Sequence, residues 1–277
     1  MGEPMMLRID GFPVAEYPDG ADLPASLGPR PHLHPVRTLG GRVVTDALPE
    51  DHRWHLGFSV ALQDVDNWNF WGGRTYVRDR GYTELDDHGR IEHVSFPLIR
   101  DDGFAERLRW RSGAGEVLVD ESRDVRARRV EAGWELALSS TLGNATEREI
   151  ELGSPATNGR TGAGYGGLFW RLPPAVAPRV FTAAASGERA VHGSVAPWLA
   201  WTDRDFTLAL TGIDEATRAD PWFVRVDDYP GVGSQLAAVR PVALPAGGAL
   251  TRGLRVLIAD GALDAMRIAA WAGSPRS

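Results

Sequence analysis

The chain has 277 residues and a formal net charge of -7, with 43% hydrophobic and 24% charged residues. This balance is typical of a folded globular protein and leaves room for one large domain. The sequence contains no cysteine, which excludes disulfides, thiolate metal ligands and cysteine nucleophiles. All 30 basic residues are arginine, so neither a Schiff-base lysine nor a P-loop lysine exists.

The longest segment without Asp, Glu, Lys or Arg, Ala190–Thr202, has 13 residues and is too short to cross a bilayer as a helix. Met1–Asp10 carries three charged side chains and lacks the apolar core of a secretory signal. The acidic balance argues against a nucleic-acid partner. Arg123 and its neighbouring arginines alternate with carboxylates, which favours a solvated strand face. We therefore expect a cytoplasmic protein that binds neither nucleic acid nor membranes.

Short segments with period-2 patterning follow one another along most of the chain. In the first half, the expected strands are residues 55–65, 90–99, 104–111, 116–130, 134–141 and 147–152. In the second half, they are residues 198–202, 206–211, 222–226, 235–244 and 250–258. Glycine-containing turns separate several of these segments at intervals of about eight to fifteen residues, which is typical of an antiparallel meander.

The two ends of the chain differ from this pattern. Residues 1–29 are expected to form an N-terminal segment of strand and loop, and residues 262–272 place apolar side chains on one helical face. No fixed period and no linker composition divides the chain. We predict one domain over residues 1–277, an all-β fold built as a large antiparallel β-sandwich with a short closing C-terminal helix.

Six of the seven histidines lie between positions 32 and 93. His32 and His34 would share a face of a strand, and His52 and His55 lie in a loop that can turn both rings to one point. Imidazole serves acid–base catalysis near neutral pH and also binds divalent metals. We expect His34, His52 and His55 to be catalytic, or alternatively to hold one divalent ion (Mn, Zn or Fe).

Aromatic residues gather in the same part of the chain. Within Asn67–Gly73, indole rings alternate with amides and precede two glycines. Flat rings stack on the C–H faces of sugars, while polar groups hydrogen-bond the hydroxyls. Trp68 and Trp71 are therefore candidate substrate-binding residues, and Glu92, which directly precedes His93, is a third.

A glycine-rich stretch covers residues 158–167. A dinucleotide fingerprint needs a strand before it and a helix after it within a parallel βαβ unit, and neither is expected here. We therefore exclude such a fingerprint and predict no nucleotide cofactor. The glycines instead let a loop pass close to a ligand, with Arg160 and Tyr165 presented to it. Tyr229, in the turn-like sequence 228–231, is a further substrate-binding candidate.

Several of these segments together resemble the "PmoA family" of uncharacterised soluble bacterial proteins. They are Arg30–Val36, Asp51–Gly57, Phe70–Gly72, Gly89–Ile91, Gly162–Gly167 and Tyr229–Gly231. The resemblance implies a large antiparallel β-sandwich, for which the galactose-mutarotase-like supersandwich is a candidate, and a family encoded beside sugar-directed oxidoreductases. The methane mono-oxygenase in the family's name is a membrane protein, so we do not expect that activity. Members tend to have a histidine where this chain has Asp51.

Three functions compete at this point. The first is a carbohydrate-active enzyme whose histidines transfer protons, in elimination or hydrolysis of a keto-glycoside or in sugar epimerisation, with or without a metal. The second is a non-catalytic carbohydrate-binding protein that uses the same aromatic residues. The third is a metal-dependent oxygenase, for which the His32–His34 pair is the best support. The expected partner is a small sugar or glycoside, and the protein is expected to be a monomer or homodimer.

Overall fold

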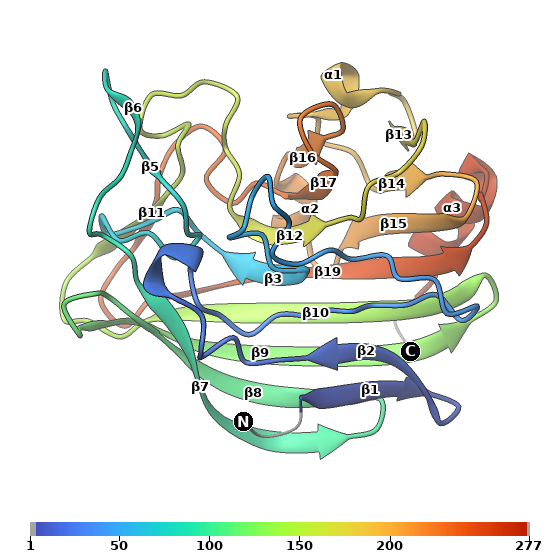
Figure 1. The fold of residues 1–277 in the computed structure, drawn as a ribbon, viewed down its shortest axis with the longest axis horizontal. Helices are drawn as coiled ribbons and strands as arrows, with labels where there is room; N and C mark the ends of the chain where they lie inside the picture. Colours follow the sequence, from blue (N-terminus) through green and yellow to red (C-terminus); the bar gives the residue numbers. More distant parts are fainter. Residues whose placement is uncertain (1–3, 276–277) are drawn as a thin grey trace.

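The computed structural model describes residues 4–275, and two antiparallel sheets share its main hydrophobic core (Figure 1). The larger sheet has eight strands. In spatial order they are β13 (Arg179–Thr182), β14 (Leu199–Thr202), β15 (Phe206–Gly212), β19 (Ala249–Asp260), β10 (Gly133–Asn144), β9 (Val117–Val130), β8 (Gly103–Arg111) and β7 (Arg90–Arg100).

The smaller sheet has four strands and positions the site described below. In spatial order they are β16 (Trp222–Arg225), β17 (Gly231–Ser234), β12 (Gly167–Arg171) and β3 (Phe58–Ala61). A three-stranded sheet follows the order β18 (Val242–Leu244), β11 (Ile150–Gly153) and β4 (Asp64–Val65). Two hairpins complete the β structure, β1 (Met5–Ile9) with β2 (Phe12–Tyr17), and β5 (Thr75–Val77) with β6 (Gly81–Thr83).

Helices are few and short. They are α1 (Glu188–Val191), α2 (Glu215–Ala219), α3 (Ala265–Ala272) and a 3-10 turn, η1 (Ala25–Leu27). The Asp264 side chain caps α3 by accepting a hydrogen bond from the backbone N–H of Arg267. Ile268 and Trp271 are the buried face of this helix. None of the helices within residues 4–275 is long and apolar enough to cross a membrane.

The core follows from the period-2 pattern of the long strands. In β10, Trp134, Leu136 and Leu138 are fully buried and belong to the main core. Phe58 of β3 and Trp170 of β12 enter the same core from the smaller sheet, with ring centroids 4.9 Å apart. Each buried large side chain contributes about 1.5–3 kcal/mol to folding. This common core holds the smaller sheet, and hence the site, against the eight-stranded sheet.

The predicted fold class is confirmed: the chain is mostly antiparallel β structure with a short C-terminal helix. The strands predicted at 90–99, 104–111, 116–130 and 250–258 match β7, β8, β9 and β19 closely. The strand predicted at 55–65 is wrong, because β3 and β4 are separate and residues 55–57 belong to the preceding loop. The strand predicted at 235–244 is also wrong, since only Val242–Leu244 is extended and paired.

Two further predictions need correction. His32 and His34 do not share a strand, because His32 lies in an irregular segment and only Leu33, between them, forms an isolated bridge. Arg123 is not on a solvated face: it is 1% exposed and pairs with buried Glu121 at 2.8 Å. Its next arginine along the strand, Arg126, is exposed as expected. The alternation of arginine and carboxylate therefore conceals one buried ion pair.

Candidate functional site

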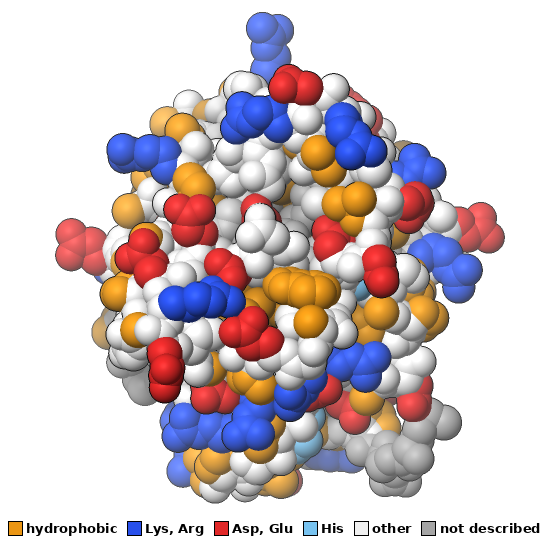
Figure 2. Space-filling view, turned by 90° about the vertical axis from the view of Figure 1, so that its left-hand side faces the viewer, with side chains coloured by type: hydrophobic (Ala, Val, Ile, Leu, Met, Phe, Trp, Pro, Cys, Tyr) orange, Lys and Arg blue, Asp and Glu red, His pale blue; other side chains and the backbone are white. Residues whose placement is uncertain are grey.

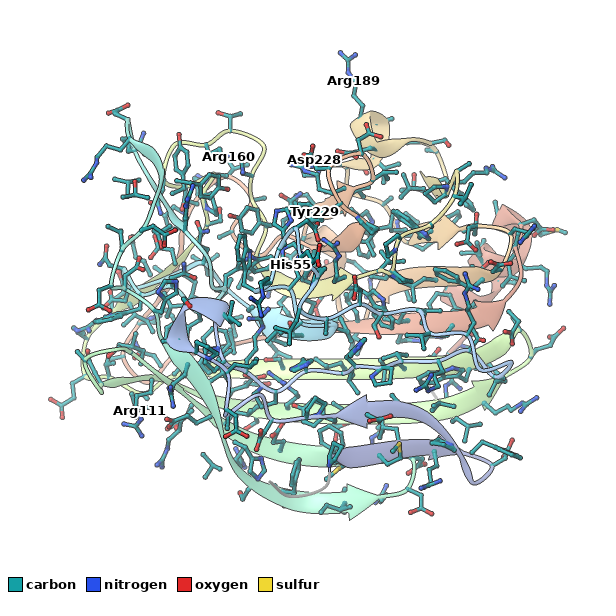
Figure 3. The ribbon with its side chains drawn as sticks, in the orientation of Figure 1. His55, Arg111, Arg160, Arg189, Asp228 and Tyr229 are labelled. Atoms are coloured by element: carbon teal, nitrogen blue, oxygen red, sulfur yellow. The ribbon has the colours of Figure 1, made fainter. Side chains whose placement is uncertain are left out.

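A cavity of about 660 Å3 lies above β3 and β12, on the side of the molecule where the β5–β6 hairpin rises (Figure 3). Its aromatic lining residues are Trp54, Trp71, Tyr82, Tyr165 and Tyr229. Its charged lining residues are Arg74, Glu84, Arg160, Arg225 and Asp228, and it also contains His52, His55 and Gln63. Figure 2 shows acidic and basic side chains intermingled across the face that carries this hairpin. The cavity thus combines flat apolar rings with hydrogen-bonding groups, the composition of a site for a small polar ligand.

The loop before β3 turns two histidines toward the same space. The His55 amide donates a hydrogen bond to the His52 carbonyl oxygen at 2.9 Å, and the Leu48 amide donates to the His55 carbonyl oxygen at 2.9 Å. These contacts close the loop on itself and stack the two imidazole rings, with centroids 4.7 Å apart and planes 14° apart. His55 is buried and His52 is partly exposed. The two rings therefore lie together, as their spacing in the sequence predicts.

Asp51 and Arg171 bind the outer edges of the two rings. His52 donates from Nδ1 to Asp51 Oδ2 at 3.0 Å, and Arg171 donates from Nη2 to Asp51 Oδ1 at 2.9 Å. The other terminal nitrogen of Arg171 donates to His55 Nδ1 at 3.3 Å. The carboxylate fixes the proton of His52 on Nδ1, and the guanidinium leaves the proton of His55 on Nε2. The two histidines consequently present opposite chemistry: a lone pair at His52 Nε2 and an N–H at His55 Nε2.

Burial and neighbouring charges shift the pKa values of His55 and Asp51. Burial, together with the nearby His52 and Arg171, lowers the pKa of His55 well below its usual value, so this ring is neutral at pH 7. Burial alone would raise the pKa of Asp51, but hydrogen bonds from His52 and Arg171 outweigh burial and hold this pKa below its usual range. Asp51 is therefore a carboxylate at neutral pH and can stabilise a protonated His52.

Tyr229 closes this cluster from the loop between β16 and β17. Its ring centroid lies 4.4 Å from that of His52 and 4.9 Å from that of His55. The Arg171 guanidinium carbon lies 5.3 Å from the Tyr229 ring centroid, within the range of a cation–π contact. Burial raises the pKa of the Tyr229 hydroxyl, which stays protonated at neutral pH.

A second hydrogen-bonded chain lines the opposite part of the cavity. Gln63 donates from Nε2 to the Tyr165 hydroxyl at 2.9 Å, and the Tyr165 and Tyr82 hydroxyls bond each other at 2.9 Å. Arg160 donates from Nη1 to the Tyr82 hydroxyl. Burial raises the pKa of Tyr165 well above its usual value, so its hydroxyl is neutral. Arg160 comes from the β11–β12 loop and Tyr82 from the β5–β6 hairpin, so the chain joins both walls.

The floor of the cavity is apolar. The Trp71 ring centroid lies 4.8 Å from that of Tyr165 and 4.9 Å from that of Phe169. Phe223 of β16 extends this cluster, with centroids 6.0 Å from both Tyr165 and Phe169. Trp71 is only 2% exposed and therefore lies beneath a ligand rather than beside it. Trp54, which is partly buried, is the indole at the rim.

Three residues hold these loops in place, and of these only Gly73 lines the cavity. Buried Arg30 donates to the carbonyl oxygens of Trp71 and Trp54, each at 3.0 Å. The Asn69 carboxamide oxygen accepts from the backbone N–H groups of Trp71 and Gly72. Gly73 has φ +67°, and a Cβ there would lie 2.7 Å from the Trp54 ring, so the indole rests directly on this glycine. The Arg30 and Asn69 side chains thus build the site without contacting its contents.

The structure brings six of the nine predicted site residues to the cavity and leaves three elsewhere. The six are His52, His55, Trp71, Arg160, Tyr165 and Tyr229. His34 does not line the cavity, and its Nδ1 bonds the Thr45 hydroxyl at 3.0 Å. Trp68 packs against the main core, and Glu92 pairs with Arg111 at 3.0 Å on the large sheet. The expectation for His34 rested on a strand that does not form around residues 32–34. The expectations for Trp68 and Glu92 rested on their proximity in sequence to other candidate residues.

The histidine cluster does not form a metal site of the expected kind. Within residues 4–275, no three His, Cys, Asp or Glu side chains are grouped so that they could hold a metal ion. His34 lies apart from the other two, and the His52 and His55 rings face each other rather than a common point. The residues present do not fit the three-histidine metal centre.

Sequence reasoning missed Arg171, which lies beneath the cavity, and the lining residues Gln63 and Tyr82. Arg171 ends β12, a strand that the pattern did not predict because all five of its residues are buried and do not alternate. Gln63 lay within the expected strand 55–65 without an assigned role, and Tyr82 lay outside every expected strand. A signal did exist for Arg171, since a charged side chain at the end of an apolar run needs a partner. Asp51, next to His52, was visible in the sequence, but the structure alone connects it to Arg171.

The chain matches the model of one protein family over nearly its whole length. The model of a family of unknown function, DUF6807, matches residues 5–272. The chain belongs to this family. The expectation of a family without known function is thereby confirmed, whereas the matching model does not bear the PmoA name. No curated protein matches the sequence.

Solved structures give a more distant likeness. A protein provisionally described as an aldose 1-epimerase from Escherichia coli K12 is 11% identical, with a TM-score of 0.45 over 92% of this chain and 98% of its own. A galactose mutarotase related enzyme from Lactobacillus acidophilus is 11% identical, with a TM-score of 0.40 over 94% and 100%. At these scores the likeness is a general one between folds, and we infer no activity from it.

Proposed function

We propose that the protein is a carbohydrate-active enzyme in which His52 moves a proton to or from a carbon of an oxidised sugar or glycoside. The observation that carries this proposal is the hydrogen bond from His52 Nδ1 to Asp51, at 3.0 Å, on a ring that lines the cavity. It leaves the Nε2 lone pair of His52 without a partner among the described residues. A base held in one tautomer by a carboxylate is the arrangement that general-base catalysis needs.

The reaction begins with a proton next to an electron-withdrawing carbonyl or carboxyl carbon. His52 Nε2 takes this proton, the C–H electron pair becomes the new C=C bond, and the negative charge moves to the carbonyl or carboxyl oxygen. In an elimination, the group on the next carbon then leaves with its bonding pair. In an epimerisation, a proton from solvent adds to the opposite face of the same carbon, and His52 later releases the proton it took to solvent. Asp51 stabilises the imidazolium that forms in either case.

His55 has a different part in this proposal. Its pKa is too low for it to be a cation at neutral pH, so we assign it as a neutral donor through Nε2–H. Arg171 holds its Nδ1 and fixes this tautomer. A neutral imidazole can donate to a substrate oxygen without placing a second positive charge beside protonated His52. Because the two rings stack closely, a second charge there would be strongly unfavourable.

The aromatic lining supports a sugar as the ligand. Trp54 and Tyr229 present ring surfaces beside His52, at centroid distances of 5.2 Å and 4.4 Å from its ring. Such rings stack on the apolar C–H faces of pyranosides, while Asp228 and Arg225 at the rim can bond hydroxyl groups. A non-catalytic sugar-binding protein would use the same rings but has no need for the Asp51–His52 pair.

The test compares turnover and binding in matched variants. His52→Gln is expected to lower turnover of a keto-glycoside or a sugar acid about 10²-fold or more, because it removes the general base. Ligand affinity should change little, since the glutamine keeps the volume and polarity of the site. His93→Gln, on the large sheet, is the control for loss of an imidazole elsewhere. Equal turnover in His52→Gln and wild type would contradict the proposal, and binding without any turnover would favour the non-catalytic alternative.

A further inference from the structure

Four arginines lie in or directly beneath the cavity, and three of them are paired with carboxylates. Arg74 pairs with Glu84 at 2.9 Å, Arg171 with Asp51 at 2.9 Å, and Arg225 with Glu188 at 3.7 Å. The fourth, Arg160, has no carboxylate partner among residues 4–275. Its bond to the Tyr82 hydroxyl and its place over the Tyr82 ring, 4.8 Å from the centroid, are contacts with an uncharged group.

The hydroxyl chain next to Arg160 has one more donor proton than the protein uses. Gln63 can only donate to Tyr165 through Nε2, because the same amide group also donates to the Arg74 carbonyl at 3.2 Å, which fixes its orientation. Arg160 can only donate to Tyr82. Each tyrosine oxygen therefore already accepts one bond from outside the pair. The two hydroxyls have two protons, one proton joins them, and the other has no acceptor in the described part of the chain.

The surplus proton belongs on Tyr82. Tyr165 is 8% exposed and Tyr82 is 36% exposed, so the Tyr82 hydroxyl is the one that a ligand can reach. With the proton of Tyr165 in the bond between the hydroxyls, the proton of Tyr82 is directed away from Tyr165. An unpaired guanidinium and a hydroxyl donor then occupy neighbouring positions on one wall. Two such donors side by side match the two oxygens of a carboxylate.

A second loop of the cavity carries an unpaired carboxylate. Asp228 lines the cavity and forms no ion pair with a described residue, and Figure 3 shows it and Arg160 on loops that rise on either side above His55. An anionic group placed near Asp228 would be repelled, while hydroxyl groups can donate to it. Asp228 therefore favours hydroxyl groups on its side of the cavity, where the nearby lining residue Arg225 is already paired with Glu188, and the unpaired Arg160 favours an anion on the other side.

We propose that Arg160 and Tyr82 form a carboxylate subsite and that the natural ligand is a sugar acid, such as a uronic acid or its glycoside. This proposal rests on the proposed function and names its substrate class: the bound carboxylate is the group that acidifies the neighbouring C–H bond. When His52 removes that proton, negative charge grows on the carboxylate oxygens. Arg160 and the Tyr82 hydroxyl, which donate to those oxygens, stabilise the charge where it develops.

Binding to wild-type protein tests the subsite without reference to turnover. The probes are methyl glucuronide and methyl galacturonide, each with its neutral parent glycoside, and glucose 6-phosphate as a different anion, all measured by calorimetry at low salt. At least one uronide should bind about tenfold or more tightly than its parent, as expected for a charge-assisted bidentate contact. Arg160→Gln should remove most of that preference and leave the affinity for the neutral glycoside within about twofold. Tyr82→Phe, which keeps the ring under Arg160, should reduce the preference by a smaller factor.

Arg189→Gln is the matched control, because Arg189 is exposed on α1 and projects away from the cavity (Figure 3). Its loss changes net charge equally and should leave the uronide preference intact. Equal affinity for acid and neutral sugars, absence of uronide binding, an equal loss in Arg189→Gln, or tighter binding of the phosphate than of every uronide would each overturn the carboxylate subsite. The proposed proton transfer can be tested separately, by the turnover of a neutral keto-glycoside. If that turnover depends on His52, the proton transfer is supported even where one of these results overturns the carboxylate subsite.

Discussion

Asp51 holds His52 by a 3.0 Å hydrogen bond from Nδ1 to Oδ2, and the two residues are adjacent in the sequence. Neighbouring side chains usually diverge, yet the turn around Pro49–His52 brings these two together, and Arg171 Nη2 lies 2.9 Å from the other oxygen of Asp51. The guanidinium therefore positions the carboxylate, and the carboxylate positions the imidazole. The position of the His52 ring consequently depends on a residue that lies far from it in the sequence.

Replacing Asp51 by asparagine should disable His52 without removing it. The new amide group would donate to Nδ1 instead of accepting from it, so the proton of a neutral His52 would move to Nε2 and occupy the lone pair that the reaction needs. We expect a loss of about 10²-fold or more in turnover, with little change in ligand affinity. Steady-state kinetics of Asp51→Asn beside Glu50→Gln, an exposed neighbouring carboxylate, would check this. Equal activities of the two variants would contradict it.

Buried His32 should make folding stability fall in mild acid. Burial lowers the pKa of His32 from 6.5 to about 4. Between these pH values the unfolded chain binds a proton that the folded chain does not, so the free energy of unfolding decreases as pH falls through this range, by about 3 kcal/mol for this group. Urea titrations at pH 7 and pH 4.5 should show a pH effect about 2–3 kcal/mol smaller in His32→Gln. An unchanged pH effect would show that His32 does not contribute.

Two glycines separate a steric effect from a backbone effect. Gly73 and Gly81 have φ of +67° and +77°, but a Cβ at Gly73 would lie 2.7 Å from the Trp54 ring, whereas a Cβ at Gly81 has nothing within 4 Å. Gly81→Ala should cost about 1–2 kcal/mol of stability from backbone strain. Gly73→Ala should cost about 1–3 kcal/mol more and weaken sugar binding, because the indole must move into the cavity. Thermal unfolding and calorimetry measure both, and similar losses in the two variants would contradict the packing of Trp54 on Gly73.

Loss of the buried ion pair within β9 should lower stability far more than loss of its exposed neighbour. Arg123 and Glu121 are both 1% exposed, and Arg123 also donates to the Tyr17 hydroxyl at 2.6 Å. Arg123→Met leaves Glu121 buried without its counter-charge and should lower the free energy of unfolding by about 3–5 kcal/mol. Arg126→Met, in an exposed pair with Asp124, should change it by less than about 1 kcal/mol. Chemical denaturation of both variants gives the comparison, which fails if their losses are alike.

The pattern of the sequence was sufficient for the fold class but not for the contacts between distant segments. The long strands β7, β8, β9 and β19 have clear turns or alternation, so period-2 patterning locates them. The pattern did not predict β12, because this strand is buried on both faces and follows a glycine-rich loop. The same limitation hid Arg171 at its end. Patterning describes one face of one strand, whereas a buried strand is defined by the neighbours on both faces.

For the site as well, the sequence indicated some residues but not their partners in distant segments. His52 and His55 were found because they are close in sequence, and Arg160 and Tyr165 because glycines flank them. Their partners Arg171, Gln63 and Tyr82 come from loops and strands that only the folded chain brings together. His34 failed as a third histidine because its segment is irregular and directs the ring to Thr45. Residue type and spacing can nominate a catalytic group, but its hydrogen-bonded partners follow from tertiary structure.

Exchange of carbon-bound hydrogen with solvent tests the central claim most directly. Wild-type protein, incubated in D2O with a keto-glucoside or a uronide that it binds, should incorporate deuterium at the carbon next to the carbonyl or carboxyl group, as followed by proton NMR. His52→Gln should slow this incorporation about 10²-fold or more while the ligand still binds. Absence of incorporation by the wild type with every ligand that it binds, or equal rates in the two proteins, would contradict proton transfer by His52.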